Sequence, residues 1–129
     1  MATSGAEMPS GGRLRPPEQC VLWREPELVG LQPAERFELV ETIADSSHAS
    51  RAVLRCRECG QLYLYDFREE VDWEKGDDPQ STTYVPLRGP EDIERLRGAS
   101  SLELMACSPR LERDFPKGAK EASVRWVGK

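Results

Sequence analysis

The chain has 129 residues, enough for one domain with a real core, but only 38% of them are apolar and 32% are charged. These shares lie below the roughly 45–50% and above the ~25% usual in globular domains, so we expect a small core that a bound metal would help to stabilise. The net charge of −5 arises within residues 66–78, which hold seven acids and two bases. Such an acidic stretch argues against direct nucleic-acid binding there.

Residues 1–19 are rich in glycine and proline and hold almost no large apolar side chains. This composition predicts a disordered tail, followed by a single small α+β domain over residues 20–129. The tail lacks the hydrophobic segment of a secretory signal, and no apolar run approaches the ~20 residues that span a bilayer. We therefore expect a cytoplasmic protein whose cysteines are metal ligands or free thiols rather than disulfides.

The residue pattern beyond the tail predicts a mostly antiparallel sheet of about four to five strands with one or two short helices. Residues 37–44 fit either a helical or a strand face, and their β-branched end favours a strand. The other expected strands are 51–55, 61–67, 81–87 and 123–127. Residues 33–36 predict one helical turn, and residues 90–98 and 100–107 predict helices, each with a suitable proline or serine start.

The most informative motif is Cys56-Arg57-Glu58-Cys59-Gly60. Two thiols two residues apart on a tight turn are typical of half a zinc site, and Gly60 permits the positive φ that such a turn requires. The turn lies between expected strands 51–55 and 61–67, so we expect an antiparallel hairpin closed by a structural zinc knuckle. A redox pair is disfavoured because reactive Cys-x-x-Cys motifs normally open a helix, whereas a strand follows here.

A structural zinc needs four ligands, and the remaining candidates are Cys20, Cys107 and His48. If residues 49–55 are extended, His48 lies roughly 26 Å from Cys56 along the strand, at ~3.3 Å per residue. The preferred metal site is therefore Cys20, Cys56, Cys59 and Cys107. Two alternatives stay open: isolated cysteines are often buried as small hydrophobic residues, and a bent segment would bring His48 back.

No catalytic or cofactor-binding residues are predicted. The acidic stretch lacks the ligand spacing of an EF-hand, and Ser46, Ser47 and His48 are only neighbours in sequence. Both faces of strand 61–67 are apolar, so its aromatic residues are either core or an exposed patch beside the acids.

The sequence therefore predicts a zinc-stabilised protein–protein interaction module with an acidic-aromatic surface for a protein with a basic surface. Alternatives are an inhibitor or immunity-type protein that masks a basic site on a nuclease or toxin, and a zinc- or thiol-dependent enzyme. The enzyme alternative predicts a cleft that holds Cys56 or Cys59 near His48 or an acid.

Overall fold

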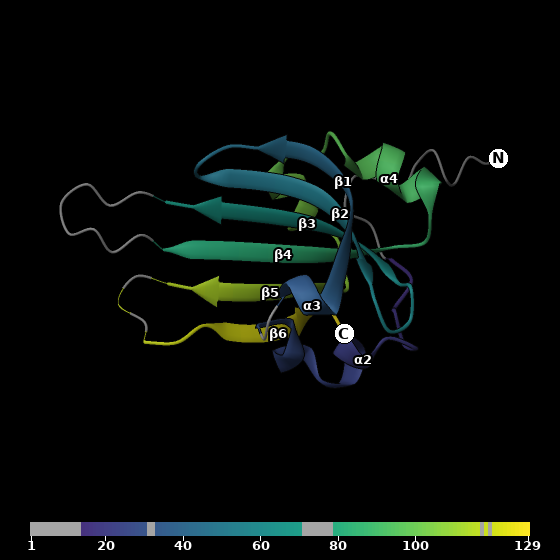
Figure 1. Ribbon diagram of the computed structural model, residues 1–129. Helices are drawn as coiled ribbons and strands as arrows, with labels where there is room; N and C mark the ends of the chain where they lie inside the picture. Colours follow the sequence, from purple (N-terminus) through teal and green to yellow (C-terminus); the bar gives the residue numbers. More distant parts are fainter. Residues whose placement is uncertain (1–13, 31–32, 71–78, 117, 119) are drawn as a thin grey trace.

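The fold is a six-stranded antiparallel sheet in which each strand pairs with the next one along the chain (Figure 1). The structure is a computed structural model and describes residues 14–30, 33–70, 79–116, 118 and 120–129. Its strands are β1 (Phe37–Asp45), β2 (Ala49–Cys56), β3 (Leu62–Glu69), β4 (Gln80–Leu87), β5 (Arg110–Phe115) and β6 (Ser123–Val127). The order β1-β2-β3-β4-β5-β6 confirms the mostly antiparallel α+β prediction.

The sheet has one strand more than the four to five expected, and the missed strand is β5. Its sequence, Arg-Leu-Glu-Arg-Asp-Phe, lacks the alternation of apolar and polar residues that identifies a half-buried strand. Glu112 is only 8% exposed. Its carboxylate accepts from Arg110 at 2.6 Å and from Arg125 of β6 at 3.3 Å. Paired charged residues therefore occupy buried positions of β5 where apolar residues would have made the strand recognisable in the sequence.

The helical segments are short: α2 (Val21–Arg24), the 3₁₀ helix η1 (Pro26–Gly30), α3 (Pro33–Arg36), α4 (Pro90–Leu96) and α5 (Ser101–Leu104). The last three lie within the segments where helices were expected. α5 begins with a capping box, in which Ser100 and Glu103 each bind the other's backbone N–H. α2 and η1 were not predicted, and α2 has no side-chain cap at its start that would have marked it.

Two apolar clusters cover opposite faces of the sheet, since adjacent strand residues Tyr63 and Leu64 belong to different clusters. The cluster beneath α4 and α5 contains Leu14, Val53, Leu64, Val85, Leu87, Leu96, Ala99, Leu104 and Cys107. The cluster beneath α2 and η1 contains Cys20, Leu22, Val29, Phe37, Cys56, Tyr63, Tyr84 and Leu111. Tyr63 and Tyr84 are therefore core residues and cannot form an exposed aromatic patch.

The first described residues are already packed. Leu14 belongs to the core, and its N–H donates to the carbonyl of Ser108 at 2.6 Å. Pro17 is fully buried. The domain boundary expected at residue 20 therefore falls inside packed structure, while residues 1–13 of the expected tail lie outside the described residues. Among the described residues, no helix is long and apolar enough to cross a membrane.

Candidate metal centre

The Cys-x-x-Cys motif forms a closed turn at the end of the β2–β3 hairpin. The N–H of Cys56, the last residue of β2, donates to the carbonyl of Gln61 at 2.8 Å. The N–H of Gly60 donates back to the carbonyl of Cys56 at 2.8 Å. Gly60 has φ +81°, a conformation that glycine adopts without strain. The antiparallel pairing of the two strands is confirmed, whereas the closing zinc stays a prediction, and the turn brings the thiols of Cys56 and Cys59 within 4.8 Å of each other.

Cys20 reaches the same place from the N-terminal segment. It is fully buried and stands at the N-cap position of α2, where its carbonyl accepts from the N–H of Trp23 at 3.0 Å. The indole N–H of Trp126 in β6 donates to the carbonyl of Leu22 at 2.7 Å. This bond fixes α2 against the sheet, and Cys20 is thereby held opposite the hairpin turn.

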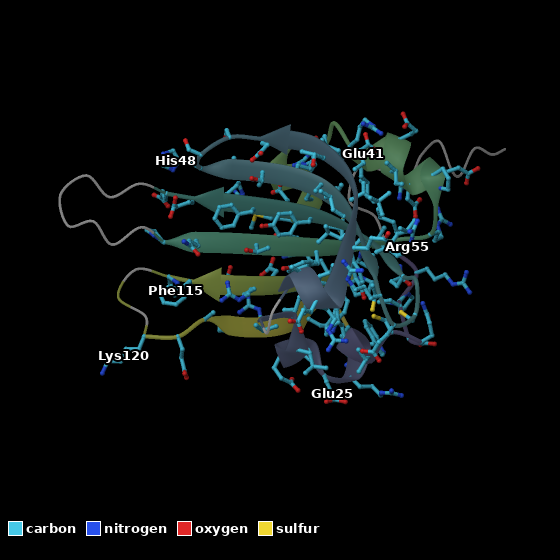
Figure 2. The ribbon with its side chains drawn as sticks, viewed as in Figure 1. Glu25, Glu41, His48, Arg55, Phe115 and Lys120 are labelled. Atoms are coloured by element: carbon cyan, nitrogen blue, oxygen red, sulfur yellow. The ribbon has the colours of Figure 1, made fainter. Side chains whose placement is uncertain are left out.

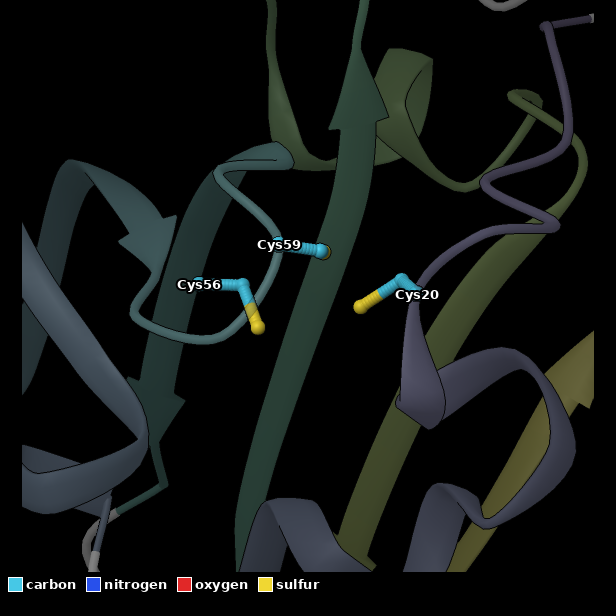
Figure 3. A group of neighbouring side chains, drawn as sticks. All are labelled: Cys20, Cys56 and Cys59. Atoms are coloured by element: carbon cyan, nitrogen blue, oxygen red, sulfur yellow. The ribbon is translucent and has the colours of Figure 1, made fainter.

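The sulfurs of Cys20, Cys56 and Cys59 all lie within 4.8 Å of one another (Figure 3). Zinc–sulfur bonds of ~2.3 Å at tetrahedral angles place ligand sulfurs about 3.8 Å apart. Side-chain movements of about 1 Å or less would close that difference. None of the three thiols is in a disulfide. Because their sulfurs are also this close together, they could share one metal ion.

The thiols of Cys20 and Cys56 lie in contrasting environments. Burial raises the pKa of Cys20 to about 12. Burial alone would also raise the pKa of Cys56, but the backbone N–H groups of Cys59 and Glu58 donate towards its sulfur, and its pKa falls below the ordinary value. Backbone donors aimed at a sulfur stabilise a thiolate, which is the form that binds a metal.

Tyr63 is the neighbour of the thiols that the sequence reasoning did not connect with the site. Its hydroxyl is buried, and the side chain that it can hydrogen-bond is the thiol of Cys20, although the contact falls short of good hydrogen-bond geometry. Burial raises its pKa first, and the nearby Cys20, Cys59 and Cys56 raise it further. The only feature of the sequence that could have linked Tyr63 to the site is its place in the strand that follows the Cys-x-x-Cys motif. A tyrosine in the core would occupy the same kind of position.

Cys107 does not join this group. It is fully buried in the cluster on the other face of the sheet, and its thiol lies 3.9 Å from the carbonyl of Glu103. Cys20, Cys56 and Cys59 are brought together, so the preferred set of four cysteines is not assembled in this structure. The reason is topological, because α5 carries Cys107 to the face opposite α2.

His48 is also remote from the three cysteines. It stands in the turn before β2, with Nδ1 3.2 Å from a carboxylate oxygen of Glu69. β2 runs extended from Ala49 to Cys56, so the histidine and the motif lie at opposite ends of the strand. Figure 2 shows the same separation between His48 and Arg55. Ser46 donates to the carbonyl of Ala49, so it forms no hydroxyl–imidazole pair with His48.

The acidic stretch is only partly described. Asp66 is buried and accepts from Arg51, and Glu69 is paired with His48. Glu70 is exposed. Residues 71–78 lie outside the described residues. They include Trp73 and most of the acidic sequence that was compared with an EF-hand calcium loop. Comparison of the chain with protein-family models, with curated proteins and with solved structures found no match.

Proposed function

We propose that this protein is a small zinc-stabilised interaction module in which Cys20, Cys56 and Cys59 bind the metal. The observation that carries the proposal is the convergence of three thiols from two distant parts of the chain to within 4.8 Å. A metal bound there ties the N-terminal segment to the β2–β3 hairpin. It would add a cross-link to a chain whose apolar share is low.

Zinc is the metal that best suits this ligand set. Thiolates are soft ligands that favour zinc, copper(I) and iron–sulfur clusters. A turn of the Cys-x-x-Cys-Gly type with N–H groups directed at the sulfur is typical of structural zinc sites. A reducing, cytoplasmic compartment, which remains part of the proposal, keeps such thiols available for metal.

A hydrolytic enzyme is less well supported. Zinc hydrolases need a general base close to the metal. His48 is at the far end of β2, and the cavity beside Cys59 has neither histidine nor carboxylate among its described lining residues. The cleft that the enzyme alternative requires is therefore not formed by the described residues.

The proposed partner is a protein with a basic surface, and an inhibitor of a nuclease or toxin is one form of this function. Support comes from the net charge of −5 and its concentration in residues 66–78. Complementary charge favours such encounters and makes them sensitive to salt. The Glu70→Gln variant should bind a lysine-rich peptide more weakly than wild type, and Glu121→Gln, an exposed acid outside the stretch, is the control. Equal binding by all three proteins would contradict the role of the stretch.

The metal part of the proposal is tested by comparing Cys56→Ser with Cys107→Ser. Both replace a thiol that is at most 1% exposed with a hydroxyl, so their packing costs are similar. With zinc present, Cys56→Ser should lose several kcal/mol of unfolding free energy beyond the loss in Cys107→Ser, because metal binding contributes directly to folding. Chelator should abolish this difference. Equal unfolding curves for the two variants in zinc would exclude Cys56 as a ligand.

A further inference from the structure

The three-cysteine set leaves one coordination position for an outside ligand. This inference rests on the proposed metal site. The sequence holds four cysteines and one histidine, and all of them are described. Cys107 lies on the opposite face of the sheet, and His48 lies at the far end of β2. The chain therefore has no further thiol or imidazole for the metal, and no carboxylate of the described residues joins the group. Zinc sites with only three protein ligands usually complete their shell with water or a bound small molecule.

The surroundings of the three cysteines indicate the side from which an outside ligand could reach the fourth coordination position. Cys20 and Cys56 are buried, whereas Cys59 is exposed. A cavity of about 310 Å³ opens beside Cys59, and its lining includes Gly60, Gln61 and Gln19. Gln19 donates to the side chain of Gln61 at 2.7 Å, which holds the N-terminal segment beside the hairpin. A small molecule thus has access to the cluster from the side of Cys59.

Two arginines give the cavity positive charge. Arg88 is already committed, since its guanidinium donates to the buried carboxylate of Asp92 at 3.1 and 3.0 Å. Arg15 is exposed and forms no ion pair with any other residue that the structure describes. An anionic group on a ligand would therefore find its partner in Arg15.

We propose that the fourth position binds a low-molecular-weight thiol that carries a carboxylate. The sulfur binds the metal, because a site with three thiolates favours a further soft ligand, and the carboxylate pairs with Arg15. The thiol loses its proton to solvent as the metal–sulfur bond forms, and a water ligand leaves the metal. No oxidation or reduction takes place.

The test uses the full-length protein loaded with cobalt(II), whose visible absorption reports the number of sulfur ligands. Titration with 3-mercaptopropionate should strengthen the sulfur-to-cobalt absorption and saturate, with cobalt still bound after desalting. 2-Mercaptoethanol, which lacks the carboxylate, should bind roughly fivefold more weakly, as expected for losing a partly exposed ion pair. The Arg15→Gln variant should bind both thiols with the weaker affinity. Arg24→Gln, which replaces an exposed arginine that does not line the cavity, should behave as wild type.

Three results would overturn the proposal, and each has a separate meaning. A cobalt spectrum that neither thiol changes would show that no small thiol enters the fourth position. Equal affinity for the two thiols, or no effect of Arg15→Gln, would remove the carboxylate pairing. Failure of the protein to bind cobalt or zinc at all would contradict the proposed metal site itself, and with it this inference.

Discussion

Tyr63 places a buried hydroxyl beside a cluster of thiols. A buried polar group without a good partner costs roughly 1–3 kcal/mol, and the contact of the Tyr63 hydroxyl with the Cys20 thiol falls short of good hydrogen-bond geometry. A thiolate at Cys20, which metal binding would create, is the natural acceptor for this hydroxyl. The residue therefore links the stability of the core to the state of the proposed metal site.

The Tyr63→Phe variant should respond differently with and without metal. In chelator its unfolding free energy should be close to that of wild type, because the buried hydroxyl that is removed has only a weak contact with the Cys20 thiol. Its zinc affinity should fall by about tenfold or more, the usual effect of removing a group that hydrogen-bonds a metal ligand. Competition with a chromophoric chelator measures that affinity.

Tyr84→Phe is the matched control, because Tyr84 is 3% exposed in the same cluster. Burial raises the pKa of Tyr84, with a smaller effect from Tyr65 and none from a cysteine. Its zinc affinity should stay at the wild-type value. An unchanged zinc affinity in Tyr63→Phe would show that the hydroxyl does not bond to a metal-bound sulfur.

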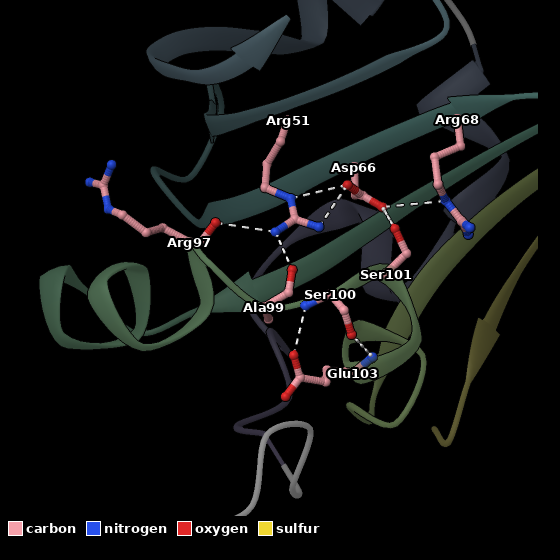
Figure 4. A network of polar contacts seen from close by, with 8 residues as sticks. All are labelled: Arg51, Asp66, Arg68, Arg97, Ala99, Ser100, Ser101 and Glu103. Carbon is pink, nitrogen blue, oxygen red and sulfur yellow. Dashed lines mark hydrogen bonds and ion pairs between the residues drawn. The ribbon is translucent and has the colours of Figure 1, made fainter.

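Among the elements, α4 and α5 are fastened to the sheet by one polar network (Figure 4). Arg51 of β2 donates twice to the buried carboxylate of Asp66 in β3, at 3.0 and 2.9 Å. The same guanidinium donates to the carbonyls of Arg97 and Ala99, in the segment between the two helices. Ser101 of α5 lies 3.3 Å from the other carboxylate oxygen. The ion pair thus joins two strands and a helical segment.

Removing the Arg51 side chain should destabilise the fold, because it leaves the carboxylate of Asp66 buried without its main partner. We expect Arg51→Met to lower the unfolding free energy by about 3–5 kcal/mol. Arg55→Met is the control on the same strand, since Arg55 pairs with Glu38 and both side chains are about half exposed. It should cost about 1 kcal/mol or less. Urea denaturation measures both, and similar losses would mean that the network does not fasten the helices.

The carboxylate of Asp92, at the start of α4, should make the free energy of unfolding depend on pH. Burial alone would raise the pKa of Asp92, but the side chain and backbone N–H of Arg88 donate to its carboxylate, and the pKa falls below the ordinary value. A carboxyl with a lowered pKa in the folded state stabilises the fold above its unfolded pKa of about 4 and loses that effect as pH falls.

Asp92→Asn should therefore cost about 2 kcal/mol of unfolding free energy near pH 7. The cost should shrink as pH falls below about 4. Glu94→Gln is the control on the same helix, because Glu94 is 73% exposed in its pair with Arg97. It should change little at either pH. A cost of Asp92→Asn that is constant with pH would contradict the lowered pKa.

At the scale of the whole molecule, local patterns predicted most elements but not their placement. The β2–β3 hairpin, α4 and the capped α5 follow from turn, proline and capping signals within a few residues. β5 was missed because the buried Glu112 is paired with Arg110 on its own strand and with Arg125 on β6. The pair with Arg125 becomes visible only when β6 lies beside β5.

The candidate site shows the same limit. Cys56 and Cys59 are positioned by a local turn, and their spacing reveals it. Cys20 and Cys107 are equally isolated in sequence, yet α2 carries one to the motif and α5 carries the other to the opposite face. The side of the sheet on which a short helix packs depends on long-range contacts, such as the bond from Trp126 to Leu22.

The most direct test of the account is the metal content of the purified chain, measured by native mass spectrometry before and after chelation. We predict one zinc per chain with three protons displaced, lost in Cys20→Ser, Cys56→Ser and Cys59→Ser and retained in Cys107→Ser. Absence of metal from wild type, or loss of metal from Cys107→Ser, would contradict the three-cysteine site.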